Sequence, residues 1–169
     1  MKPALPETWI KSIYTQAEAE YPKECCGMIL GPKGKSGISR LRPCKNRQDD
    51  YHARDPENFP RSARAAYFID PRELLEIQKE IRKTSEEIRI IYHSHVDAGA
   101  HFSEEDRRIA ISEGEPTYPG VDYLVVSVIK GKATEMNLFL WDREKRDYRE
   151  SSSARERWRI SRNESELQR

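Results

Sequence analysis

The stretch IIYHSHVDAGAHFSEEDRRIA, residues 90–110, decides how the chain folds around its most reactive side chains. Residues 88–92 are rich in β-branched side chains and predict a buried strand. Residues two apart in a strand lie on the same face, so His93 and His95 are expected to project together from the strand end. After a loop of seven residues, Ser103 begins a predicted helix.

Two imidazoles on one face form a natural pair of metal ligands, because neutral imidazole is the usual nitrogen donor to zinc. A catalytic zinc ion also needs a third protein ligand and one open position. Asp106 suits this role, since it lies in the first helical turn and residues 96–102 can fold that turn over the strand end. His101 is a rival ligand, but its place in the middle of that loop favours the rim of the site.

A second interpretation of the same residues is structural. The sequence SEED, residues 103–106, also fits a capping box with an acidic first turn facing the helix dipole. The histidines would then be hydrogen-bonded polar residues at a strand end. Ser103 suits both interpretations, whereas Asp106 bound to a metal is not expected to reach back and cap the helix. Ser94 either orients a ligand or faces the opposite core.

The remaining elements follow from periodicity and turn signals. Residues 6–20 form an amphipathic helix, and Asp70 caps a second helix with Glu73 placed for a capping box. The helix that starts at Ser103 runs to about Glu113, where GEPTYPG breaks it. Further strands are expected at residues 28–30, 38–44, 67–69, 123–129 and 134–141. This mixture of hairpins and helical connections predicts an α/β or α+β fold, a single domain with a mixed sheet flanked by helices.

Two segments carry no strong periodicity. Residues 46–66 are polar and are predicted to be a long loop, of a kind that is often functional. After Asp142 the residues are mostly charged, which predicts a surface helix or a tail with solvated charges. The domain is therefore placed at residues 1–150 and the charged tail at residues 151–169.

Composition excludes several classes of function. The chain has 169 residues and a net charge of +1, which does not favour a nucleic-acid or membrane partner. It lacks a long apolar run and the apolar core of a signal peptide. Three cysteines do not make a disulfide framework, so the cytoplasm is the expected compartment. Cys25 and Cys26 are adjacent and should point to opposite faces of a strand as packing residues.

A wider pattern joins two distant segments. Glu24 within PKECCGMILG, then H-x-H at His93 and His95, seven residues, and S-x-x-D at Ser103 and Asp106 together resemble the JAMM (MPN-plus) metallopeptidase motif. The resemblance covers roughly residues 6–141 and implies a JAMM/cytidine-deaminase-like arrangement. It departs from the family at Val96 and Phe102, where proline is usual.

The resemblance implies the site roles. His93, His95 and Asp106 would hold Zn²⁺, Glu24 would act as general base, and Ser103 would stabilise an oxyanion. Taken alone, Glu24 is an ordinary exposed acid.

The implied function is a zinc-dependent peptidase or isopeptidase. It would cleave after the C-terminal diglycine of a ubiquitin-like or sulfur-carrier protein, with residues 46–66 as a groove wall or a homodimer contact. A non-catalytic MPN-type scaffold that binds protein partners is one alternative. A metallohydrolase of small amides is another, kept open by Val96 and Phe102.

Overall fold

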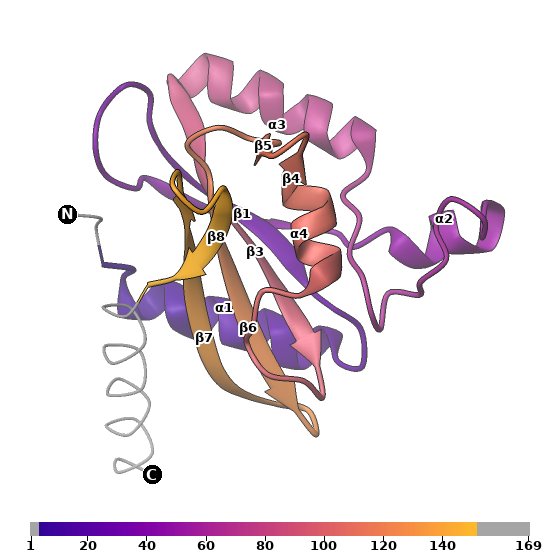
Figure 1. Cartoon of the computed structure of the whole chain (residues 1–169). Helices are drawn as coiled ribbons and strands as arrows, with labels where there is room; N and C mark the ends of the chain where they lie inside the picture. Colours follow the sequence, from indigo (N-terminus) through magenta and orange to yellow (C-terminus); the bar gives the residue numbers. More distant parts are fainter. Residues whose placement is uncertain (1–3, 152–169) are drawn as a thin grey trace, which may run out of the picture.

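The computed structural model describes residues 4–151, which form a sheet with helices on both faces (Figure 1). The helices are α1 (Glu7–Glu20), α2 (Gln48–Arg54), α3 (Pro71–Thr84) and α4 (Glu104–Ala110). The six strands of the main sheet are β1 (Cys26–Pro32), β2 (Arg40–Cys44), β3 (Glu86–Val96), β6 (Asp122–Ile129), β7 (Lys132–Asp142) and β8 (Asp147–Glu150). Two short strands, β4 (Ile111–Ser112) and β5 (Glu115–Pro116), form a separate pair.

The main sheet has the order β2-β1-β3-β6-β7-β8. Strands β3 and β6 are parallel, and every other neighbouring pair is antiparallel. Two parallel neighbours need a crossover connection, and here it contains α4 and the β4–β5 pair. The predicted class, a mixed sheet flanked by helices, is confirmed.

Each face of the sheet has its own hydrophobic core. Helix α1 covers one face with Ile13 and Ala17, while α3 and α4 lie on the other face (Figure 1). Cys25 belongs to the α1 side and Cys26 to the α3 side, as the alternation predicts. Burial raises the pKa of the Cys25 thiol to about 12, so this cysteine is a packing residue rather than a nucleophile.

The start of α3 differs in part from the prediction. The Asp70 carboxylate accepts from the backbone N–H of Arg72 at 2.8 Å, as expected of a cap. The predicted capping box is wrong, because the Glu73 carboxylate accepts from Arg42 at 3.1 Å and from the backbone N–H of Lys45 at 3.2 Å. A guanidinium is a stronger partner for a carboxylate than a neutral amide, which explains the difference.

The segment from residue 46 to residue 69 was predicted as a loop followed by a strand; the loop prediction holds for residues 55–66, and the strand prediction is wrong. Residues 48–54 form α2, and the expected strand at 67–69 is a single bridge between Asn46 and Ile69. The Asn46 side chain explains this order, since it donates to the carbonyl of Ala66 and accepts from the backbone N–H of Phe68. Tertiary contacts of one amide therefore organise the segment.

Two element ends and one additional strand also differ from the prediction. Strand β3 continues to Val96 and so includes both histidines. Helix α4 ends at Ala110 rather than Glu113, because Ile111 is extended and pairs with Pro116. The chain after Asp142 does not become a tail at once, since β8 pairs with β7 and buries a tyrosine in the core.

The tail prediction for 152–169 lies outside the described residues, so the boundary between domain and tail stays a prediction. Within residues 4–151, none of the helices has the length and apolar character that crossing a membrane requires.

Candidate metal centre

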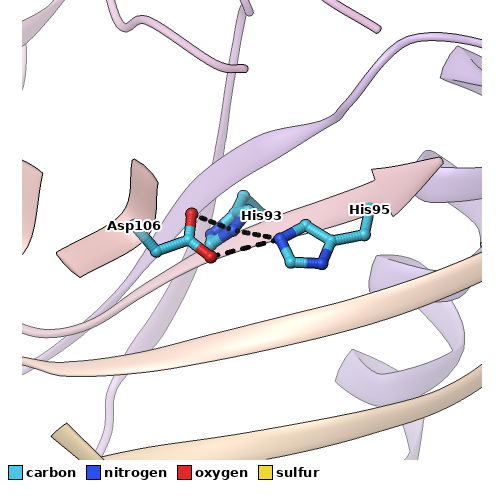
Figure 2. Close-up of side chains that lie close together, drawn as sticks. All are labelled: His93, His95 and Asp106. Atoms are coloured by element: carbon cyan, nitrogen blue, oxygen red, sulfur yellow. Dashed lines mark hydrogen bonds and ion pairs between the residues drawn. The ribbon is translucent and has the colours of Figure 1, made fainter. Parts of the chain in front are cut away.

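Two histidines lie at the carboxyl end of the central strand β3, where β1 and β6 flank His93 and β6 alone pairs with His95. His93 is paired with Cys26 of β1 and Val125 of β6, and His95 is paired with Ser127 of β6. Both side chains are buried and point toward the first turn of α4 (Figure 2). The strand pairing therefore fixes the backbone of both imidazoles, as the alternation predicted.

Three side-chain groups converge at this point: His93, His95 and Asp106 (Figure 2). The Nε2 atoms of the two imidazoles are 3.2 Å apart. Asp106 Oδ1 lies 2.9 Å from His93 Nε2, and Asp106 Oδ2 lies 3.2 Å from His95 Nε2. All three residues are buried, so they form a closed cluster of two nitrogen donors and one carboxylate.

The spacing of these atoms fits a zinc ion. Tetrahedral zinc with ligands at about 2.0–2.1 Å has neighbouring ligand atoms about 3.3 Å apart. The measured separations of 2.9–3.2 Å are close to this value without any rearrangement of the backbone. Two imidazoles and one carboxylate also make a donor set that zinc commonly takes in catalytic sites.

The second ring nitrogen of His95 has a partner that suits a metal ligand. His95 Nδ1 lies 2.9 Å from the carbonyl oxygen of Gly99, while its Nε2 faces the Asp106 carboxylate. A neutral imidazole carries one N–H and cannot donate to both acceptors. The tautomer in which Nδ1–H donates to Gly99 leaves the Nε2 lone pair facing the cluster, and this is the tautomer that a metal ligand requires.

Asp106 serves the helix and the cluster together. Its Oδ2 accepts from the backbone N–H of Ser103 at 2.8 Å, and its own N–H donates to Ser103 Oγ at 3.1 Å. The expectation that Asp106 must choose one role is therefore wrong, since its two oxygens offer about four lone-pair positions. Burial acts to raise the pKa of this carboxyl, but His93 and His95 outweigh it and hold the pKa well below its usual range.

Glu24 lies immediately before β1, next to the carboxyl end of β3. Ser94 makes this connection, because its Oγ accepts from the backbone N–H of Cys25 at 2.7 Å and its N–H donates to the Cys25 carbonyl. The backbone N–H of Glu24 donates to Ala63, and its carbonyl accepts from Asn46. Thus Ser94 does not face the cluster; it holds the segment that carries Glu24.

The Glu24 side chain is only 5% exposed, so it is not the exposed acid that it resembles when taken alone. Burial raises its pKa well above the ordinary value, the negative charge of Asp106 adds to this rise, and Arg61 opposes it. The carboxyl is not a member of the three-residue cluster. It is a buried acid that senses the charge of the cluster, which is a common condition for proton transfer.

Two aromatic contacts at the cluster were missed by the sequence. Tyr67 stacks on His93 with ring centroids 4.6 Å apart, and His93 Nδ1 has no hydrogen-bond partner among residues 4–151. His101 is exposed, and its ring lies edge-on to His95 at 5.1 Å. It therefore lies at the rim, as expected.

The loop between His95 and Ser103 is fixed at both ends. Asp97, with φ of 52°, accepts from Tyr21, Arg64 and the backbone N–H of Lys130. Phe102 is buried, and its ring stacks on the ring of Phe139 with the two centroids 5.2 Å apart. Val96 continues β3 opposite Val128. Packing and hydrogen bonds thus hold a loop that lacks the prolines usual at its ends.

Comparisons with known proteins agree with this geometry. A family described as prokaryotic homologs of the JAB domain matches residues 6–144. The "CysO-cysteine peptidase" of Mycobacterium tuberculosis is 27% identical over 70% of this chain and 68% of its own length. The "Desampylase" of Haloferax volcanii is 28% identical over 66% of this chain and 67% of its own length.

Solved structures show the same fold. A solution structure of a protein from Desulfitobacterium hafniense has a TM-score of 0.62 at 24% identity and covers 88% of both chains. One from Salinibacter ruber has a TM-score of 0.57 at 22% identity, covering 90% of this chain and 89% of that one.

Proposed function

Because the chain belongs to the prokaryotic JAB-domain family, we propose that it is a zinc-dependent peptidase or isopeptidase that cleaves after the C-terminal diglycine of a sulfur-carrier or ubiquitin-like protein. The observation that carries this proposal is the buried convergence of His93, His95 and Asp106. The names of two relatives, a CysO-cysteine peptidase and a desampylase, support the class of reaction.

His93, His95 and Asp106 would hold the zinc ion. When bound, zinc polarises a carbonyl and lowers the pKa of a water molecule to about 7, so that a nucleophile exists at neutral pH. The Gly99 carbonyl orients His95, and the Ser103 N–H orients Asp106. These contacts preset the ligands in the positions that coordination requires.

Glu24 would move the proton. An attacking water has to lose a proton and the leaving amine has to gain one, and a single carboxyl group can do both in turn. Burial and the negative charge of Asp106 favour the protonated carboxyl, which suits proton delivery to the leaving amine, whereas a bound cation would favour the ionised carboxylate that accepts the proton. The buried position also excludes bulk water from the transferred proton.

Ser103 would stabilise the oxyanion that forms as the carbonyl becomes tetrahedral. Its Oγ already accepts from the backbone N–H of Asp106, so its own O–H is left to donate into the site. The cap therefore orients the donor, and one hydroxyl serves both the helix and the reaction.

Ser103→Ala is expected to lower kcat by about 10²- to 10³-fold, as the loss of an oxyanion donor does. The loss of the cap should also lower the free energy of unfolding by about 1 kcal/mol. Ser103→Thr, which keeps the hydroxyl, is the control and should retain most of the activity. An unchanged rate in the alanine variant, beside a lower melting temperature, would leave Ser103 a cap and nothing more.

The diglycine preference has a physical basis. A residue next to the scissile bond has to bring its backbone close to buried groups at a strand end, and glycine has no Cβ to prevent this. The tail would bind in an extended form, in which main-chain hydrogen bonds contribute affinity.

The test is cleavage of a sulfur-carrier protein that carries a C-terminal extension after its diglycine. We expect mass spectrometry to show one product ending in Gly-Gly, no product with a chelator, and recovery when zinc is added. A carrier with Ala-Ala at the same place is the control. A chain without bound zinc and without cleavage would favour the protein-binding scaffold, and cleavage of small amides alone would favour the small-amide hydrolase.

A further inference from the structure

A cavity of about 350 Å³ lies beside the three-residue cluster, and none of the cluster residues lines it. Its floor is a row of three side chains from adjacent strands, Met28, Ile91 and Tyr123, which the strand register places side by side. One wall is the segment 58–69, and the other is α4 with Ile109. Its volume is within the range of ordinary ligand-binding pockets, and its lining is mostly apolar.

One ring separates this cavity from the cluster. Tyr67 lines the cavity and also stacks on His93 at a centroid distance of 4.6 Å. Whatever enters the cavity therefore lies one aromatic ring away from a cluster residue. The distance suits a part of the substrate near the scissile bond but not at it.

The floor of the cavity also carries an unpaired polar atom. Tyr123 is 2% exposed, and its hydroxyl has no hydrogen-bond partner among residues 4–151. A buried hydroxyl without a partner is costly, so phenylalanine would serve a purely structural role better. The oxygen is screened from solvent by its neighbours, so an entering group would form a hydrogen bond with it after a small shift of the lining.

We propose that this cavity is a specificity subsite for one large apolar side chain of the substrate tail, before the diglycine. The inference rests on the proposed function. Two glycines offer no side chain, so discrimination among tails has to come from residues further back. An extended tail advances about 3.3 Å per residue, so the third and fourth residues before the bond lie about 7–10 Å from it. A distance of about 7–10 Å leaves room for the Tyr67 ring between the cluster and the cavity.

The lining residues and the volume of the cavity favour a large apolar side chain. Phe59, Phe68 and Leu74 supply the apolar surface, while the charged groups of Arg61, Glu105 and Arg108 lie among the lining residues and pair with one another. A side chain of leucine to tyrosine size would fill much of the volume. The Tyr123 hydroxyl would add a preference for tyrosine over phenylalanine.

The test uses peptides in which residue X occupies the third or fourth place before the scissile bond. At one of these places, kcat/KM for X as leucine or phenylalanine should exceed that for alanine by about 10- to 100-fold. Leu74→Trp, which fills the cavity, should abolish this preference. The matched control is Leu75→Trp on the same helix, because Leu75 is 56% exposed and does not line the cavity. If Leu74→Trp keeps the same preference for residue X as Leu75→Trp, the cavity is not the subsite. A preference that exists only for the residue after the scissile bond would also overturn the proposal.

The hydroxyl is tested by a second pair of changes. Tyrosine at X should exceed phenylalanine severalfold in the unaltered protein, and Tyr123→Phe should remove that difference. Equal rates for tyrosine and phenylalanine would overturn the role of the hydroxyl.

Binding without cleavage separates this inference from the proposed function. Product peptides ending in X-Ala-Gly-Gly are titrated into protein with labelled methionine methyl groups. The Met28 signal should shift with X as phenylalanine, whereas Met136, in the core on the α1 side, should not. Peptide-dependent shifts of Met28 without any cleavage would support the subsite and contradict the peptidase. Cleavage at a rate that does not depend on X, with no shift of the Met28 signal, would support the peptidase and contradict the subsite.

Discussion

Glu24→Gln is expected to lower kcat by about 10²- to 10⁴-fold, the usual contribution of a general acid and base. The amide has the shape of the acid but cannot take a proton from water. Zinc should stay at one ion per chain, because Glu24 lies outside the three-residue cluster. The measurement is steady-state cleavage of the extended carrier together with elemental analysis of the same sample.

The control for this variant is Glu20→Gln, the same change at a half-buried acid of α1 that bonds to Gln16. It should keep its rate within about threefold, as surface changes usually do. A Glu24→Gln protein that is folded, carries zinc and cleaves at the unaltered rate would show that another group moves the proton.

His95→Ala should lose both zinc and cleavage. It removes one of the two nitrogen donors and leaves the Asp106 carboxylate buried with His93 as its remaining imidazole partner. Removing a partner of a buried hydrogen-bonded group typically costs about 1–3 kcal/mol of stability, so the melting temperature should fall as well. Elemental analysis, thermal melts and the cleavage assay measure the three effects.

His101→Ala is the matched control, because this exposed histidine lies in the same loop but outside the cluster. It should keep its zinc and its rate. If His95→Ala bound zinc at full occupancy, His95 would not be a ligand, and the buried contact with Asp106 would be structural.

The part of the site that local patterns control could be predicted. Alternation in β3 placed His93 and His95 on one face, and the helix start at Ser103 placed Asp106 in a first turn. Both inferences need only the period of a strand and the rules of helix capping. The dual role of Asp106 was missed because a motif does not show how two oxygens share their partners.

The parts that depend on tertiary contacts could not be predicted. The carbonyl of Gly99 orients His95, but a backbone oxygen leaves no signature in the sequence. The apolar run that begins at Tyr67 predicts a strand, whereas one amide, that of Asn46, determines the path of its segment. Strand β8 was missed because its residues are mostly charged and show no strand pattern of their own. Its formation depends on pairing with β7.

The histidine cluster and residues 58–69, which form one wall of the cavity, can change independently in evolution. The imidazoles inherit their positions from the pairing of β3 with β1 and β6, whereas residues 58–69 belong to a connecting segment outside that ladder. With the proposed subsite, drift in the connecting segment would change which tails are accepted and leave the cluster unchanged. Exchanging residues 58–69 between relatives is then expected to transfer the preference for the tail and to leave turnover intact.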